Sequence, residues 1–141
     1  MKEIFVYTDG GSLNNPGKSA IGVIIKFEDK IKEYAKEIGI KTNNEAEYEA
    51  VIFALEKIKK FLGKEKIKNY KIILHLDSEL VGKQLRGEYK ILEENLQRYF
   101  IQFWNLKIDF GEIEIKIIPR EENQRADKLV KSVLFQKNGL F

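Results

Sequence analysis

The stretch EIFVYTDGGSLNNPGKSAIGVIIKF, residues 3–27, decides the fold. The apolar run Ile4–Tyr7 ends on Thr8 and Asp9, two glycines follow, and a second apolar run covers residues 21–27. Two apolar runs separated by Gly, Asn and Pro predict a β-hairpin. An unpaired carboxylate at the end of a buried strand is costly. Asp9 is therefore either a turn residue or a metal ligand, and the rest of the chain has to distinguish these roles.

Strands and helices alternate after this hairpin. Apolar alternation and buried apolar runs predict further strands over residues 30–40, 70–76 and 112–119. Helical periodicity predicts helices over 42–62, with Asn43 or Asn44 as the cap, and over 78–86, 91–104 and 123–135. The order β-β-β-α-β-α-α-β-α predicts an α/β fold, a five-stranded mixed sheet of three antiparallel strands and then parallel strands, flanked by helices. Ligands of such sheets bind beyond the carboxyl ends of parallel strands, where Asp9 and Asp77 fall.

Composition limits the chemistry. The 141 residues are 43% apolar and 33% charged, which is typical of one globular domain spanning residues 1–141. The absence of cysteine and the single His75 exclude disulfides, thiolate zinc sites and multi-histidine sites. The remaining oxygen ligands favour Mg²⁺ or Mn²⁺. Because no apolar run approaches ~20 residues, we expect a cytoplasmic protein without membrane contact, and a net charge of +3 permits a polyanionic partner.

Helical phase separates one acid of the 42–62 helix from the others. At about 100° per residue, Glu47 falls on the apolar stripe, whereas the remaining acids point elsewhere: Glu45, Glu49 and Glu56. A position facing solvent accounts for the presence of those three acids in a helix, but it does not account for Glu47. Asp127 flanks the apolar stripe of the last helix and lies in its first turn if Asn123 is the cap. A charge–dipole contact of about 0.3–1 kcal/mol explains Asp127 equally well.

Taken singly, Asp9 and Asp77 are more often turn or cap residues, because aspartate is common in both settings. Taken together, two acids at strand ends and two acids facing inward from helices are predicted to converge on one point. Four uncompensated carboxylates repel one another, so a divalent cation is their natural partner.

The motifs YTDGGS, NNPG, TNNEAEYEA, LHLDSELV and PREENQRADKL resemble, in this order, the successive motifs of ribonuclease H of the type 1 class. The match covers nearly the whole chain. The resemblance implies a ribonuclease H-like fold and endonucleolytic hydrolysis of the RNA strand of RNA–DNA hybrids. The acids that match the family's catalytic, metal-binding positions are Asp9, Glu47, Asp77 and Asp127.

The same resemblance implies two Mg²⁺ ions about 4 Å apart, with Mn²⁺ as the alternative. One ion would lower the pKa of the attacking water and the other would stabilise the leaving 3′ oxygen. The products would carry 5′-phosphate and 3′-hydroxyl ends. Asp9 would bridge both ions, and the other three acids would complete the coordination.

Substrate contacts also follow from the resemblance. Asn15, Asn43 and Asn44 match positions that contact the hybrid, although turn and cap chemistry explains them too. Amide side chains suit recognition of the 2′-hydroxyl that distinguishes RNA from DNA. Phosphate contacts are expected from the basic residues that closely follow the third acid: Lys83, Arg86 and Lys90.

Three features depart from the family pattern. The segment IKIIPREENQ, residues 115–124, lacks the loop histidine that many members carry. The candidates for replacing it are Arg120, Glu121 and Glu122, while His75 is expected in the sheet. Glu79 stands where some relatives have glutamine. No dense lysine cluster follows the third acid, so we expect modest affinity for the hybrid.

Two alternatives stay open. A nuclease that also or mainly cuts double-stranded RNA has the same motifs. A non-catalytic nucleic-acid-binding module of this fold predicts a missing acid, and all four are present. We expect a monomer whose partner is an RNA–DNA hybrid.

Overall fold

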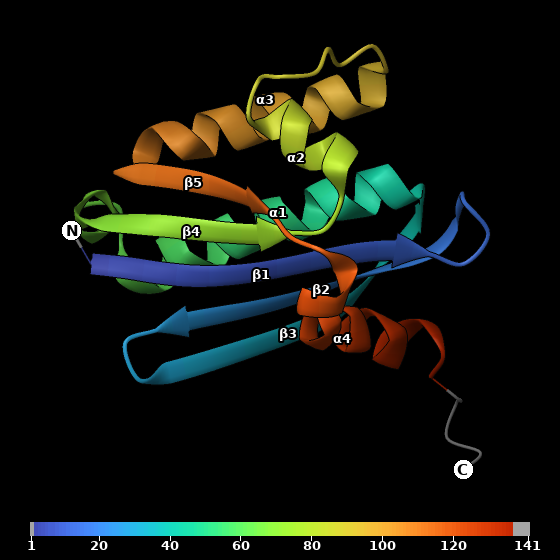
Figure 1. Ribbon diagram of the computed structural model, residues 1–141, viewed down its shortest axis with the longest axis horizontal. Helices are drawn as coiled ribbons and strands as arrows, with labels where there is room; N and C mark the ends of the chain where they lie inside the picture. The colour runs from blue at the N-terminus through green and yellow to red at the C-terminus, as the bar shows by residue number, and fades with distance from the viewer. Residues whose placement is uncertain (1, 137–141) are drawn as a thin grey trace.

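The computed structural model describes residues 2–136 (Figure 1). Its elements are β1 (Lys2–Ser12), β2 (Gly17–Phe27), β3 (Lys30–Lys41), α1 (Asn43–Leu62), β4 (Tyr70–Leu76), α2 (Glu79–Leu85), α3 (Glu94–Asp109), β5 (Glu112–Ile117) and α4 (Gln124–Leu134). Short 3-10 turns precede β4 and α4. The predicted order of strands and helices is confirmed. Within the described residues, no helix has the length and apolar character needed to cross a membrane.

The strands form one mixed sheet in the order β3-β2-β1-β4-β5. β2 pairs antiparallel with β1 and β3, whereas β4 pairs parallel with β1 and β5. Figure 1 shows α4 packed across β2 and β3, with α1 on the opposite face of the sheet and α3 against α1. The predicted fold class is therefore confirmed.

The main core lies between the sheet and α1. β4 is buried from Ile72 to Leu76, as its continuous apolar run predicts. On α1, the buried large apolar side chains recur at helical spacing: Tyr48, Val51, Leu55 and Ile58. Glu47 is buried among them, so the prediction from helical phase is confirmed.

β1 is longer than predicted. We expected it to end near Asp9, but the strand continues to Ser12 because residues 9–12 pair with β2, with Asp9 opposite Gly22. Its pairing with β4 ends earlier, at Tyr7 and His75. Asp9 thus does not end the strand, but it lies just past the point where β1 and β4 part. Asp77 directly follows β4 and lies beside the same point.

The start of α1 also differs from the prediction. The N-cap is Thr42, and neither Asn43 nor Asn44 has that role. Thr42 Oγ1 accepts a hydrogen bond from the Glu45 N–H at 3.1 Å, and Glu45 Oε1 accepts one from the Thr42 N–H at 2.9 Å. This reciprocal capping box satisfies two free backbone donors. The two asparagines are therefore available for other contacts.

Two glycines allow close approach of the helices to the sheet. A Cβ at Gly10 would lie 2.3 Å from the backbone of Ala46 in α1, and a Cβ at Gly22 would lie 2.4 Å from the carbonyl oxygen of Ala126 in α4. Only glycine leaves room for these backbone contacts. In both helices, the residue that follows the contacted alanine is one of the predicted site acids.

Candidate active site

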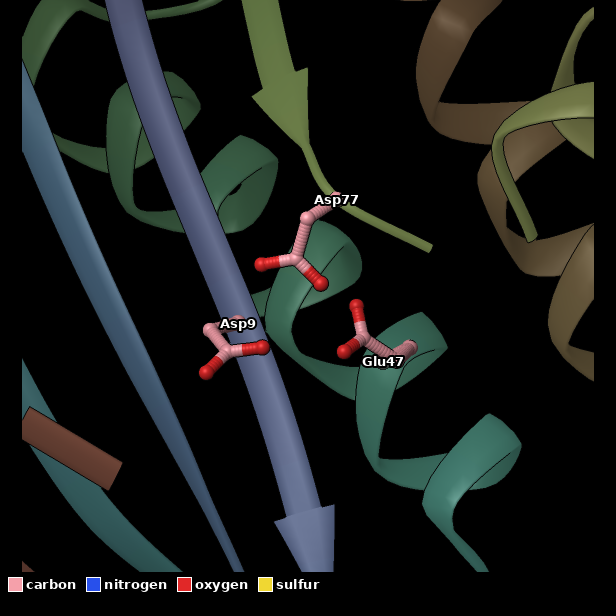
Figure 2. A group of neighbouring side chains, drawn as sticks. All are labelled: Asp9, Glu47 and Asp77. Atoms are coloured by element: carbon pink, nitrogen blue, oxygen red, sulfur yellow. The ribbon is translucent and has the colours of Figure 1, made fainter. Parts of the chain in front are cut away.

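Three carboxylates converge where β1 and β4 part. One oxygen each from Asp9, Glu47 and Asp77 lies within 4.8 Å of the other two. Figure 2 shows the three side chains pointing toward one another from β1, from α1 and from the segment after β4. Asp9 and Glu47 are only 7% and 6% exposed, whereas Asp77 is partly exposed.

Glu47 is held by one hydrogen bond and leaves one oxygen unused. Its Oε1 accepts from the Gly10 N–H at 3.3 Å. Its Oε2 is buried and has no hydrogen-bond partner among residues 2–136. A buried polar atom without a partner costs about 1–3 kcal/mol. Binding of a cation by this oxygen would remove that cost.

Asp127 lies at the margin of the cluster. It is not one of the three mutually close acids, and its Oδ2 lies 3.0 Å from Nζ of Lys131 in α4. It nevertheless lines the same cavity of about 440 Å³ as the other acids. The structure therefore brings three of the predicted acids together and places the fourth on the wall of their cavity.

Burial changes the protonation of the cluster. It raises the pKa of the Asp9 carboxyl to about 7, and the negative charges of Asp77 and Asp127 add to this effect. Burial and the adjacent Asp9 charge likewise raise the pKa of Glu47 well above its usual value. The two acids consequently favour keeping a proton near neutral pH, unless a cation replaces it.

The donor set fits a hard divalent cation. All close ligand atoms are carboxylate oxygens, which Mg²⁺ and Mn²⁺ prefer over softer ligands. Arg120 is the one cationic side chain among the described residues that line the cavity. Lysines outside the cavity lining pair with Asp127 and Glu79. The three close acids have no such lysine partner among the ion pairs of residues 2–136, so a cation bound there would balance their charge, with Glu47 Oε2 positioned to contribute.

The predicted asparagines connect the β1–β2 loop to the start of α1. Asn15 Oδ1 accepts from the Asn43 N–H at 2.9 Å, and Asn43 Oδ1 accepts from the Ser12 N–H at 2.9 Å. Asn43 and Asn44 line the cavity together with the acids, whereas Asn15 does not. The turn chemistry of Asn15 and Asn43 uses their oxygens, so their amide donors are not consumed by it.

The three predicted basic contacts differ in their surroundings. Lys83 pairs with Glu79 at 2.8 Å on the exposed side of α2. Arg86 donates from Nε at 3.1 Å and from Nη2 at 2.8 Å to the Ile115 carbonyl oxygen, which ties the end of α2 to β5. Lys90 is exposed. Arg86 thus has a structural contact with which any phosphate would compete.

Asn123 is the N-cap of α4, as the sequence predicts, but the contacts of its side chain were not predicted. The Asn123 side chain makes no capping hydrogen bond. Its Nδ2 donates to the Thr8 carbonyl oxygen at 2.8 Å and to Asp77 Oδ2 at 2.9 Å. The sequence feature that could have indicated these contacts is the position of Asn123, one helical turn before the candidate acid Asp127.

His75 lies in the sheet, as expected. Its Nδ1 is 3.0 Å from the Val6 carbonyl oxygen, and its ring stacks on Tyr7 at a centroid distance of 4.2 Å. It lines no part of the acid cavity.

Comparison with known proteins identifies the family. A family model described as reverse transcriptase-like matches residues 7–133. Ribonuclease HI of Halobacterium salinarum is 37% identical over 133 residues, which cover 93% of this chain and 64% of that protein. The chain belongs to the type 1 ribonuclease H family. It spans less than two thirds of the length of this relative, and 35% of a bifunctional protein of Mycobacterium tuberculosis that is 30% identical over 135 residues.

Solved ribonuclease H structures have the same fold. LC11 ribonuclease H1, isolated from compost, superimposes with a TM-score of 0.86 at 38% identity, covering 96% of this chain and 98% of that one. Ribonuclease H1 of Halobacterium salinarum also gives 0.86 at 36% identity, covering 96% and 99%. LC11 ribonuclease H1 in complex with an RNA/DNA hybrid gives 0.85 at 39% identity, covering 92% and 94%.

Proposed function

We propose that this chain is a metal-dependent endoribonuclease that hydrolyses the RNA strand of RNA–DNA hybrids. The observation that carries the proposal is the convergence of Asp9, Glu47 and Asp77 within 4.8 Å in a ribonuclease H fold. The hybrid complex of LC11 ribonuclease H1 supports the choice of substrate. The cavity beside the acids is polar and open, which suits a nucleic-acid backbone.

The acids of the cluster, joined by Asp127, are the proposed ligands of two Mg²⁺ or Mn²⁺ ions. Such ions, when bound, supply water activation and stabilisation of the leaving 3′ oxygen. The contribution of the chain is to hold its ligands in place. The Gly10 N–H fixes Glu47, and the Asn123 amide fixes Asp77. The proposed products carry 5′-phosphate and 3′-hydroxyl ends.

Substrate recognition is assigned to asparagines that line the cavity and to basic residues of α2 and the segment after it. Asn43 and Asn44 at the start of α1 are the proposed readers of the RNA strand, because amides donate to and accept from a 2′-hydroxyl. Asn15 holds Asn43 in place, because Asn15 Oδ1 accepts a hydrogen bond from the Asn43 backbone N–H. Lys83 and Lys90 are the proposed phosphate contacts, and sparse basic charge favours a modest affinity. Arg86 is proposed to join them only by giving up part of its contact with β5.

The test is cleavage of an end-labelled RNA–DNA hybrid, double-stranded RNA and double-stranded DNA, each with Mg²⁺, with Mn²⁺ and with EDTA. We expect cleavage of the RNA strand of the hybrid, only when a divalent cation is present. Faster cleavage of double-stranded RNA would assign a different main substrate. Binding of the hybrid without cleavage under any metal condition would favour the non-catalytic module.

A further inference from the structure

Asn123 joins two parts of the polypeptide that lie far apart in sequence. Its side chain is 1% exposed, and its Nδ2 donates to the Thr8 carbonyl oxygen, 115 residues away, and to Asp77 Oδ2. An asparagine amide has two N–H donors, and these contacts use both. The amide is therefore fixed in one orientation by a backbone acceptor on one side and a site carboxylate on the other.

The two acceptors lie where the sheet opens. Thr8 directly follows Tyr7, the last residue of β1 that pairs with β4. Asp77 directly follows Leu76, the last residue of β4. The Asn123 amide thus connects the two strands at the point where the hydrogen bonding between them stops. This is also the point at which the three carboxylates gather.

Asn123 also anchors the helix that carries the fourth acid. The Asp127 N–H donates to the Asn123 carbonyl oxygen at 3.1 Å, in the first turn of α4. Asparagine is among the best N-cap residues, and its side chain normally accepts a hydrogen bond from its own helix. Here the side chain makes no such bond. Its two N–H donors bond instead to Asp77 Oδ2 and to the Thr8 carbonyl oxygen of β1.

We propose that Asn123 is a positioning residue for the acid cluster. Its amide holds the Asp77 carboxylate, and its backbone holds the start of α4, in the arrangement that receives a divalent cation. This inference rests on the proposed function, because it assumes that the cluster binds a metal ion. Residues that orient metal ligands change metal affinity by about 10- to 100-fold when they are replaced.

Gln84 provides a matched control. It is also a buried amide, 4% exposed, and it accepts from the Tyr48 hydroxyl at 2.7 Å and donates to the Lys90 carbonyl oxygen at 3.3 Å. It has no contact with the acid cluster among its hydrogen bonds in residues 2–136. Gln84→Ala therefore removes comparable internal bonds without touching a carboxylate.

The experiment follows thermal unfolding of the full chain against Mg²⁺ concentration, a readout independent of activity. We expect Asn123→Ala to raise the Mg²⁺ concentration at half-maximal stabilisation by about 10- to 100-fold. At fixed subsaturating Mg²⁺, its kcat on the hybrid falls while its KM stays near that of the wild type. Gln84→Ala lowers Tm but leaves the Mg²⁺ midpoint unchanged. A lower Tm with a wild-type midpoint and kcat in Asn123→Ala overturns the proposal.

A second measurement covers the case in which Asn123→Ala does not fold. In the wild-type chain, the side-chain amide resonances of Asn123 should exchange slowly with solvent and shift as Mg²⁺ binds, unlike those of the exposed Asn105. Resonances of Asn123 that do not respond to bound Mg²⁺ overturn the proposal. If Mg²⁺ shifts them but no duplex is cut, the proposed function fails while the positioning role stands. A wild-type chain without any Mg²⁺ response overturns both.

Discussion

Asp9 and Glu47 are ionisable side chains buried at positions where folding alone would favour uncharged ones. Both are less than a tenth exposed, and each lies against further acids. Burying a charge without a partner costs free energy, which the chain meets by raising the pKa values of both groups. Neutral side chains of the same shape should therefore fold better and function worse.

Asp9→Asn is expected to stabilise the metal-free protein at about pH 8 by about 2–4 kcal/mol, since each pKa unit corresponds to about 1.4 kcal/mol. Burial raises the pKa of Asp9 from 3.8 to about 7, so the native state keeps a proton that the unfolded chain has lost. Wild-type stability therefore falls as pH rises across this interval, and the advantage of the variant grows with it. Urea unfolding in EDTA across this range checks the prediction. Equal stabilities at about pH 8 would contradict it.

Glu47→Gln is expected to lower hybrid cleavage by at least about 100-fold, the upper limit for residues that only support a metal ligand. The matched control is Glu56→Gln on the exposed side of the same helix, which should cleave at the wild-type rate. Single-turnover cleavage at saturating enzyme separates chemistry from binding, and circular dichroism checks folding. Comparable activity of both variants would remove Glu47 from the site.

The sequence revealed Glu47 but not the contact made by Asn123, and the difference is physical. A helix places every residue at a fixed angle, so an acid on the apolar stripe is visible from periodicity alone. Asn123 precedes its helix, and its partners belong to β1 and to the end of β4. Only the packing of α4 on the sheet brings these groups together. The choice of Thr42 as the cap was equally hidden, because two asparagines follow it and both threonine and asparagine are favourable N-cap residues.

At the scale of elements, glycine contacts set how closely the helices approach. Gly10 lies against α1 and Gly22 against α4, and each contact immediately precedes a site acid. The order of strands and helices along the chain was predictable, because strands and helices have different hydrophobic periods. The length of β1 was not, because its two glycines indicate a turn, whereas pairing with β2 keeps residues 9–12 extended. A strand's end depends on its partner as much as on its own residues.

Gly10→Ala is expected to destabilise the protein by about 1–3 kcal/mol, because its Cβ would meet the Ala46 backbone at 2.3 Å and push α1 from the sheet. The Mg²⁺ midpoint should rise as well, since Glu47 moves with the helix. Gly11→Ala is the matched control, because its Cβ would meet Val130 Cγ1 at an ordinary 3.6 Å. Chemical unfolding and Mg²⁺ titration of both variants provide the check. Similar losses in the two variants would show that backbone flexibility, not crowding, matters.

At the scale of the whole molecule, the three close carboxylates come from three separate regions of the chain: β1, α1 and the segment after β4. A cation that bridges them ties these regions together and stabilises the native state alone. At 100 times the dissociation constant, this stabilisation is about 2.7 kcal/mol. The cluster is therefore expected to affect unfolding of the entire protein.

Saturating Mg²⁺ is expected to raise Tm by about 5–15 °C relative to EDTA, since 1 kcal/mol shifts Tm by roughly 2–8 °C in proteins near this size. The rise should be much smaller in Glu47→Gln, which loses a ligand. Calorimetry with Mg²⁺, with EDTA and with matched NaCl separates specific binding from screening. An equal rise in NaCl would attribute the effect to ionic strength.

The bond between Asn123 and Thr8 also has a consequence for synthesis on the ribosome. The two residues lie 115 positions apart in the sequence, so β1 leaves the exit tunnel long before Asn123, whose amide bonds to both Thr8 and Asp77. A nascent chain that stops before Asn123 retains Asp9, Glu47 and Asp77 but lacks the amide that holds Asp77 and also lacks Asp127. Under the proposed function, translation products that end before Asn123 should therefore be inert, and cleavage of the hybrid should begin only once α4 docks on the sheet.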